Sequence, residues 1–193
     1  SNITSTNFIT AKREKLSKNY MAKFFIEDCY HIVSINGYFD ESISDKLPDG
    51  VEISNIINSD SNIENIFSKI SNYKSNPFNA INTSKFKEGI LLSTSCKKID
   101  KPIQLINFFL SEKKDQGHYP RLLVKTEEQT SFSLINHFIS SNHNQHLINS
   151  VVEIDILQNS KINYNVIQQG NIYSNSIHST GINQASNSKL NYN

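Results

Sequence analysis

The chain has 193 residues and a formal net charge of +1, with 19 Lys and Arg against 18 Asp and Glu. This near-balance argues against broad binding to nucleic acids or anionic membranes, because both need a one-signed patch. No apolar run approaches the length of a membrane span, and residues 1–7 carry no secretory signal. We therefore expect a cytoplasmic protein without nucleic-acid or membrane partners. The two cysteines, Cys29 and Cys96, lie far apart and are expected to be free and reduced.

The first 88 residues predict a small mixed α/β region. Residues 11–25 space Leu16, Tyr20 and Phe24 four apart, as one face of a helix does. Short β-branched runs predict two strands, each next to a turn signal. These segments are the strand 31–35, the turn Asn36-Gly37, the turn 47–50 and the strand 51–53.

Two further helices are predicted in the same region. Residues 61–74 place apolar side chains at helical spacing behind a capping box formed by Ser61 and Glu64. The second helix should start at Asn76-Pro77 and end near Gly89. None of these elements shows a catalytic or cofactor-binding pattern. We assign residues 1–88 to an N-terminal α/β region.

From residue 89 onward, short β runs follow one another and helical spacing disappears. Several runs alternate apolar and polar residues, which points every second side chain to the same side of a strand. The predicted strands are Ile90–Ser93, Ile103–Phe109, Leu122–Lys125, Phe132–Phe138, Val151–Leu157, Ile162–Ile167 and Leu190–Tyr192.

Four of these strands repeat at a nearly constant interval. Phe132, Ile162 and Leu190 follow similar small polar turns in steps of 30 and 28 residues, and Ile103 lies 29 residues before Phe132. Such a period indicates a stacked solenoid, in which each coil covers the apolar stripe of the next. The inward residues that should line one shared core are Phe132, Leu134, Ile162, Tyr164, Leu190 and Tyr192.

We therefore predict a mainly β fold, with the first coils of a parallel β-helix at residues 89–193 after the α/β region at residues 1–88. A β-sandwich with evenly spaced strands is the alternative. The chain stops at Asn193 inside a predicted strand and begins without Met. An uncapped coil exposes unpaired backbone, so we expect an internal fragment, truncated at the C-terminus.

Seven short motifs follow one another along the chain. They are the segments Val33–Phe39, Phe78–Asn82, Lys101–Leu105, His118–Val124, Phe132–Phe138, Asn149–Ile154 and Val166–Gln169. In this order and spacing they resemble the SufB/SufD family of the SUF iron–sulfur cluster assembly system, and SufD more than SufB. Asn136 departs from the pattern, because the family often has Glu at this position.

The resemblance implies a right-handed parallel β-helix between an N-terminal region and a C-terminal helical domain. It also implies a non-catalytic scaffold subunit: SufD pairs with SufB, both bind the ATPase SufC, and the whole complex handles the iron–sulfur cluster. The family's interface residues are expected beyond Asn193. The resemblance therefore places no catalytic, cofactor-binding or metal-binding residue on this chain.

Four histidines, His137, His143, His146 and His178, form the nearest approach to a metal-ligand set. No carboxylate or thiol nearby in the sequence completes a site, so exposed loop histidines are the expectation. Cys96 precedes two lysines that could activate a thiol, but without an orienting His an ordinary thiol in a turn is expected.

Glu153 and Asp155 lie two apart on a predicted strand and so face the same way, as paired carboxylates do for acid–base work. If the intervening apolar residues face inward, this pair faces water, and a solvated polar face is the expectation. Arg121 is expected either to cap the solenoid edge or to form an ion pair.

A carbohydrate-active or adhesive β-helix protein of the extracellular type is the alternative function, because architecture alone does not fix function. A polysaccharide lyase would line one outer sheet with Asp, Arg and Lys, whereas charges are sparse after residue 128. We therefore expect a scaffold that is not an enzyme and that binds no cofactor itself.

Overall fold

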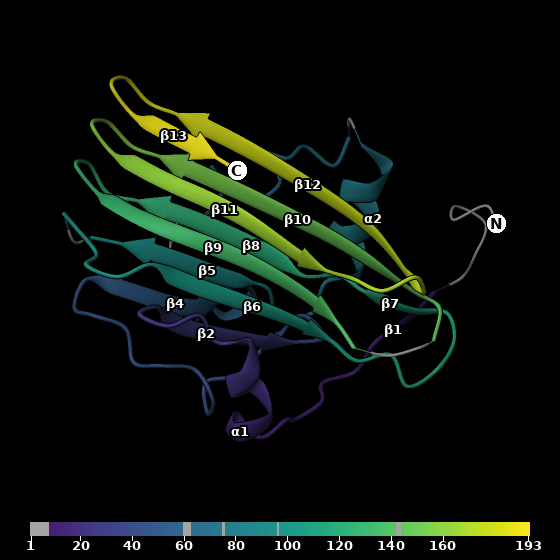
Figure 1. The fold of residues 1–193 in the computed structure, drawn as a ribbon. Coiled ribbons are helices and arrows are strands. Elements are labelled where there is room, and N and C mark those ends of the chain that lie inside the picture. Colours follow the sequence, from purple (N-terminus) through teal and green to yellow (C-terminus); the bar gives the residue numbers. More distant parts are fainter. Residues whose placement is uncertain (1–7, 60–62, 75, 96, 142–143) are drawn as a thin grey trace.

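The computed structural model describes residues 8–59, 63–74, 76–95, 97–141 and 144–193. Within these residues two β-sheets of seven and six strands face each other, and the chain passes from one to the other (Figure 1). Their inward side chains meet in one large apolar cluster. The longest described helix has 9 residues, and none in this part of the chain is long and apolar enough to cross a bilayer.

The seven-stranded sheet, sheet A, contains β1 (Ile9–Thr10), β4 (Val51–Asn55), β5 (Ile90–Thr94), β7 (Gln116–His118), β8 (Arg121–Thr126), β10 (His146–Ile156) and β12 (Ser174–Gln184). The six-stranded sheet, sheet B, contains β2 (Tyr30–Ile35), β3 (Tyr38–Phe39), β6 (Ile103–Phe109), β9 (Ser131–Ser140), β11 (Lys161–Gln169) and β13 (Lys189–Tyr192). The described helices are α1 (Lys18–Met21), the 3₁₀ turns η2 (Ala22–Phe24) and η3 (Ile56–Asn58), and α2 (Pro77–Lys85).

The strands stack in parallel along the axis of the molecule. In sheet A, β5, β8, β10 and β12 pair in parallel, and in sheet B so do β2, β6, β9, β11 and β13. Only β3 and β4, at the lower end of the two sheets, pair antiparallel among the described strands. This arrangement is a β-solenoid of about three turns, which confirms the predicted mainly β fold.

The same turn leads from sheet A to sheet B in three successive coils. Gln129, Asn159 and Asn187 all adopt the left-handed conformation, with φ of 61°, 59° and 57°. The turns also bond to each other: the Gln129 amide donates to the Gln158 carbonyl, and the Asn159 amide donates to the Ser186 carbonyl. A repeated turn keeps the number of residues per coil nearly constant, which is the origin of the sequence period.

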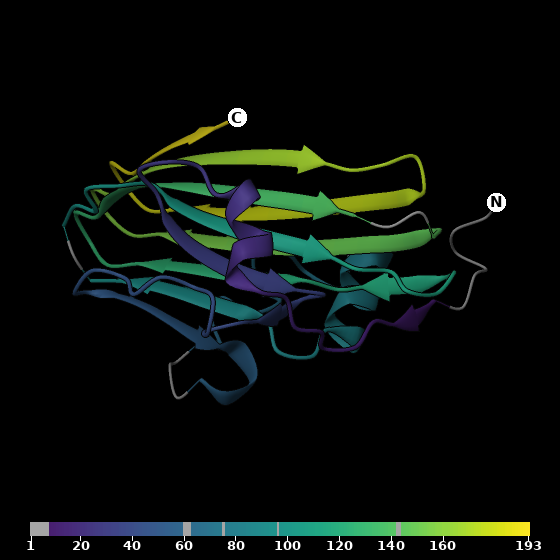
Figure 2. The ribbon, with the colours of Figure 1, turned by 60° about the horizontal axis from the view of Figure 1, so that its bottom comes forward.

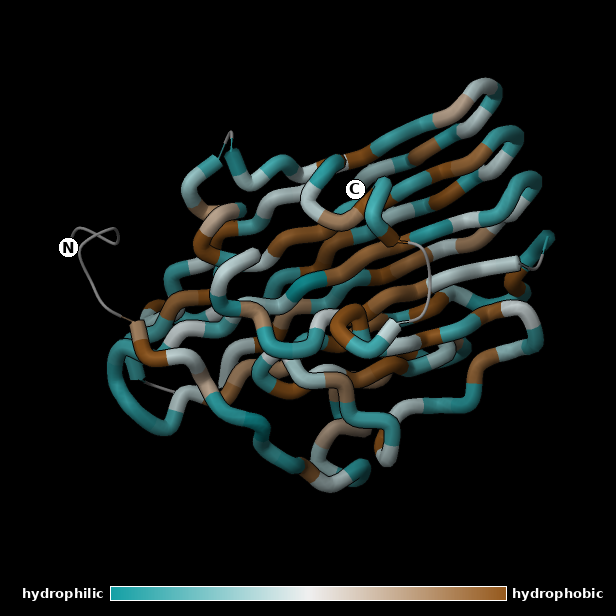
Figure 3. The backbone as a smooth tube through the Cα atoms, turned by 180° about the vertical axis from the view of Figure 1, so that it is seen from behind, coloured by the Kyte–Doolittle hydropathy of each residue, from teal (hydrophilic) through white to brown (hydrophobic). Residues whose placement is uncertain are grey.

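The inward stripe packs as predicted up to the last described coil. Phe132, Leu134, Ile162 and Tyr164 are at most 3% exposed, and the apolar segments of the stacked strands lie beside one another in Figure 3. Leu190 packs against this cluster but remains half-buried. The prediction for Tyr192 is wrong as to burial, because its ring stacks on Tyr164 yet is 55% exposed.

The strand that begins at Ile103 pairs with β9 in a different register from the predicted one. Ile103 pairs with Leu134 and not with Phe132, although Lys98 already pairs with Ser131. Two extra residues are therefore accommodated between Lys98 and Ile103. This stretch contains Pro102, which has no N–H to donate to a sheet, and a bulge there is consistent with that property.

The N-terminal helix predictions hold only in part. The segment 11–25 forms only the four-residue α1 and the turn η2, and α2 occupies most of the predicted helix 76–89. The prediction of a helix at 61–74 is wrong. Ser61 lies outside the described residues, and residues 64–74 form successive turns, since Ser68 has a φ of +56° that a helix does not allow.

Residues before 89 contribute strands to both sheets. β2 pairs along its whole length with β6, and β4 pairs with β5. The helices lie outside this framework: α1 covers the outer face of sheet B, and α2 covers the outer face of sheet A (Figure 2). The boundary between residues 88 and 89 stays a prediction.

The polar strand β12 is not among the predicted strands. Its eleven residues include few apolar side chains, yet it pairs with β10 at every position from Ser174 to Gln184. Its backbone pairing is therefore set by the strand beneath it.

Candidate functional site

A buried ion pair between Arg121 and Glu153 lies on the outer face of sheet A. Both side chains are 0% exposed, and the guanidinium donates directly to the carboxylate. Arg121 also donates to Asn82 Oδ1 and Thr83 Oγ1 of α2, at 3.2 and 3.1 Å, and to Ser68 Oγ at 3.2 Å. Arg121 therefore forms the ion pair that was one of its two predicted roles.

The carboxylate of Glu153 also accepts two backbone hydrogen bonds. The amides of Ser68 and Ser71 donate to its two oxygens at 3.1 and 2.9 Å. The positive φ of Ser68 belongs to the turn that presents these amides. Together Arg121, Glu153, Ser68, Ser71 and Asn82 form a cluster that we call the clasp, which fixes residues 64–74 and α2 to sheet A.

The clasp corrects the prediction that Glu153 belongs to a solvated polar face. Val152 and Ile154 do face inward, but residues from the N-terminal region cover Glu153. Only Asp155, further along β10, remains partly exposed, where it accepts a hydrogen bond from Asn183 at 2.7 Å. Both oxygens of Glu153 are engaged inside the clasp, whereas Asp155 bonds to β12, so the two carboxylates do not act as a pair.

Two histidines lie inside the solenoid, at the end away from the main apolar cluster. His118 of β7 and His146 of β10 are both 0% exposed, and their rings meet edge to face with centroids 5.5 Å apart. His146 Nδ1 lies 2.7 Å from the Asn144 carbonyl, and its Nε2 lies 2.6 Å from Ser140 Oγ. Because a carbonyl only accepts, Nδ1 carries the proton and Nε2 accepts from Ser140.

His118 has no hydrogen-bond partner for either ring nitrogen among the described residues. Its ring also packs against Phe109, with centroids 5.1 Å apart. Burial, with a smaller contribution from His146, lowers the pKa of His118 to about 3. This imidazole is therefore neutral at physiological pH.

The histidines considered as metal ligands do not converge. His137 lies on the outer face of sheet B, where its Nδ1 accepts from Gln104 and its Nε2 donates to Gln169, both at 3.0 Å. His178 packs against Phe138 and is exposed, and His143 lies outside the described residues. The expectation of exposed loop residues is wrong for His137 and His146, because both are buried in strands.

No group of three or more His, Cys, Asp or Glu side chains could hold a metal ion in the part of the chain that the structure describes. Cys96 lies outside that part. Cys29 is free and half-buried, and burial, followed by the charge of Asp28, raises the pKa of its thiol.

Neither the clasp nor the buried histidine pair His118–His146 could be found from a motif in the sequence. Their members come together only because strands that are distant in the sequence stack on one another.

A comparison with known protein families finds a match to the C-terminal part of the chain, which contains the buried ion pair and the two buried histidines. Residues 108–193 match the SUF system FeS cluster assembly SufBD core domain. The matched range includes β7 to β13, and with them Arg121, Glu153, His118 and His146. The match supports the SufB/SufD family and a role in SUF iron–sulfur cluster assembly. No curated protein matches the chain.

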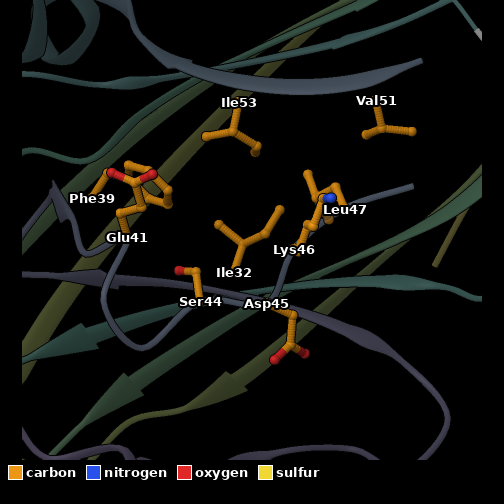
Figure 4. A pocket seen from close by; sticks show the side chains of 9 residues that line it. All are labelled: Ile32, Phe39, Glu41, Ser44, Asp45, Lys46, Leu47, Val51 and Ile53. Atoms are coloured by element: carbon orange, nitrogen blue, oxygen red, sulfur yellow. The ribbon is translucent and has the colours of Figure 1, made fainter. Parts of the chain in front are cut away.

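A pocket of about 410 Å³ lies outside the range matched by the SufBD core domain. It is formed at the lower end of the solenoid between β2 and β4, where Ile32, Val51, Ile53 and Leu47 gather (Figure 4). Asp45 lines its edge and is bound by His31 and Lys18. Burial raises the pKa of Asp45, but these hydrogen bonds outweigh it and the pKa is lowered.

Proposed function

We propose that this chain is a SufD-type scaffold segment of a cytoplasmic SUF complex, which pairs with a SufB-like subunit and a SufC-like ATPase. The match of residues 108–193 to the SufBD core domain carries the proposal. In this proposal the iron–sulfur cluster is the cargo of the whole complex, and the residues of this chain shape and stiffen the scaffold without holding the cluster.

The way the structure uses its polar groups supports a scaffold role. The fully buried ion pair of Arg121 and Glu153 is engaged in fixing the N-terminal region to the solenoid. Such a clasp joins segments 82 to 85 residues apart, as between Glu153 and the amides of Ser71 and Ser68. A stiff stack of strands is a suitable support for partner subunits.

The experiment is co-purification under oxygen-free conditions. The full-length protein that contains this chain is tagged and expressed with its genomic neighbours, and the recovered partners are identified by mass spectrometry. The proposal expects a SufB-like protein and an ABC-type ATPase in stoichiometric amounts.

A tagged, unrelated β-solenoid protein expressed in the same cells is the control for adhesion to the resin. Recovery of the protein without these partners, together with a signal peptide on the full-length gene, would overturn the proposal and favour the extracellular carbohydrate-active reading.

A further inference from the structure

The outer face of sheet B is only partly covered. The N-terminal residues around Met21, Phe24 and Phe25 pack on β2 and β6, together with Ile139 at the far end of β9. The beginnings of β9, β11 and β13 lie beyond this cover (Figure 2). Their outward side chains are polar, and the apolar residues between them point into the core.

A column of lysines crosses the start of these strands. Lys98 is bridged to Ser131, Ser131 pairs with Lys161, and Lys161 pairs with Lys189. Lys161 and Lys189 therefore lie directly opposite each other on adjacent strands, about 4.8 Å apart along the solenoid axis. The three lysines of the column are exposed.

Asparagines form a second and a third column beside the lysines. Asn191 donates to Asn163 at 2.7 Å, and Asn163 donates to Ser133 at 3.1 Å. Asn193 donates to Asn165 at 3.0 Å in the next column. These mutual bonds hold the amides in fixed positions. We call the surface formed by Lys98, Ser133, Lys161, Asn163, Asn165, Lys189 and Asn191 the lysine–asparagine platform.

Placing Lys161 opposite Lys189 lowers the stability of the sheet, and no feature of the fold itself explains why a lysine stands there. Like charges directly opposite on neighbouring strands are destabilising. A lysine on an outermost strand can protect that edge from unwanted pairing. β11, however, is paired on both sides, so edge protection does not account for Lys161.

No acidic side chain neutralises the column within the described residues. The ion pairs found there involve other basic groups, namely Arg13, Lys18, His31, Lys101 and Arg121. Glu127 and Glu128 are close in sequence, but they lie in the turn before β9 and form no ion pair with the column. The platform thus offers cations and amide donors, and no ion pair of the described residues engages its lysines.

We propose that the lysine–asparagine platform is a docking surface for an acidic helix of a partner protein, lying along the solenoid axis. Carboxylates at positions i and i+4 of a helix are about 6 Å apart and match Lys189 and Lys161. Because Lys161 lies between Lys189 and Lys98 in this column, a third carboxylate at i+11, about 10.5 Å beyond i+4 along the axis, matches Lys98, which is about two strand spacings from Lys161.

The chemistry favours an acidic protein segment over a nucleic acid. The platform contains no aromatic side chain on which a base could stack, and both arginines of the chain, Arg13 and Arg121, lie elsewhere. A polar and flat surface also gives no apolar anchor for a lipid bilayer. The proposal goes beyond the proposed function, since it concerns a different surface and does not need the SUF partners.

The test is fluorescence anisotropy with a labelled synthetic helical peptide that carries Glu at i, i+4 and i+11 on one face. The protein carries Lys161→Glu with Lys189→Glu, or the matched charge reversal Lys113→Glu with Lys114→Glu in the loop before β7. The platform variant should lose about tenfold or more in affinity, and the control should stay within about twofold at the same ionic strength. Circular dichroism verifies that both variants fold.

Three results would overturn the proposal. These are equal losses in the two double variants, equal binding of the peptide with Gln in place of Glu, and tighter binding of a single-stranded RNA of the same charge. Failure here leaves the co-purification result unaffected, so the two proposals are tested separately.

Discussion

At Arg121 and Glu153 two opposite charges are held entirely out of water, and each depends on the other. Replacing Glu153 by Gln keeps the shape but leaves the guanidinium without its counter-charge. We expect the free energy of unfolding to fall by about 3–5 kcal/mol, as when one partner of a buried pair is removed. Urea denaturation followed by circular dichroism measures this change.

Asp155→Asn is the matched control, because an amide can still accept the hydrogen bond from Asn183. Its effect should stay within about 0.5 kcal/mol. A double variant with Arg121→Met and Glu153→Leu should recover much of the loss, since no buried charge remains. Equal stability of E153Q and D155N would contradict the role of the clasp.

His118 makes a prediction about acid stability. Its folded-state pKa of about 3 lies below the ordinary value of 6.5, so the unfolded chain takes up a proton that the folded chain does not. Between these values the free energy of unfolding should fall by about 1.4 kcal/mol for each unit of decreasing pH. Urea titrations across this pH range should show a shallower slope for His118→Leu than for the wild type.

His146 and Asp45 remain in that variant, and their lowered pKa values contribute to the remaining pH dependence. Burial lowers the pKa of His146 as well. An unchanged slope in His118→Leu would mean that His118 titrates freely in the folded protein, contrary to its burial.

Sequence patterns say little about these residues. Arg121 could be assigned an ion pair, but its partner could not be identified, because Glu153 alternates with apolar residues as a solvent-facing residue would on an uncovered sheet. The cover comes from Ser68 and Ser71, more than 80 residues away. Only the folded chain brings these distant groups together.

At the scale of elements, the segment 64–74 depends on a glycine of the topmost described strand of sheet A. A Cβ at Gly181 would lie 2.5 Å from Ser71 Oγ and 3.0 Å from the backbone carbonyl carbon of Ile70. Gly181→Ala should therefore displace this segment and accelerate its cleavage in limited proteolysis. Gly170→Ala is the control, since among the described residues its Cβ would meet only Ser174 Oγ, at 3.1 Å. Equal cleavage rates in the two variants would contradict this close approach.

The repeated turns give a second prediction at this scale. Gln129 and Asn159 occupy equivalent left-handed positions, which suit glycine best, asparagine next and glutamine least. Gln129→Gly should raise the free energy of unfolding by about 0.5–1 kcal/mol more than Asn159→Gly does. Thermal denaturation of the two variants measures the difference, and a larger gain for Asn159→Gly would contradict it.

Elements with apolar alternation were predictable, and those without it were not. β6 has the predicted bounds, since Ile103–Phe109 is a continuous apolar-rich run. β12 was not predicted, because its inward positions include Ser and Thr and its sequence therefore shows neither apolar alternation nor a β-branched run. The helix predicted at 61–74 failed for the opposite reason: its apolar spacing is helical, but Ser68 turns the backbone to bind Glu153.

At the scale of the whole molecule, each coil rests on the one beneath it. The repeat period in the sequence was sufficient to predict this stacking, because coils of nearly constant length leave few other ways to bury the inward stripe. The contribution of the N-terminal residues to both sheets was not predictable, since β2 pairs with β6 across 73 residues that contain no repeat. The lower end of the solenoid is thus built from sequence that lacks the period.

The central claim is that this solenoid supports iron–sulfur cluster assembly in a SUF complex, and cluster formation measures it most directly. The full-length protein containing the chain is combined anaerobically with its SufB-like and SufC-like partners, ferrous iron, cysteine and a cysteine desulfurase, and the visible absorbance of the cluster is followed with time. We predict faster cluster formation when this protein is present than when it is omitted. Equal rates with and without it would contradict the scaffold role.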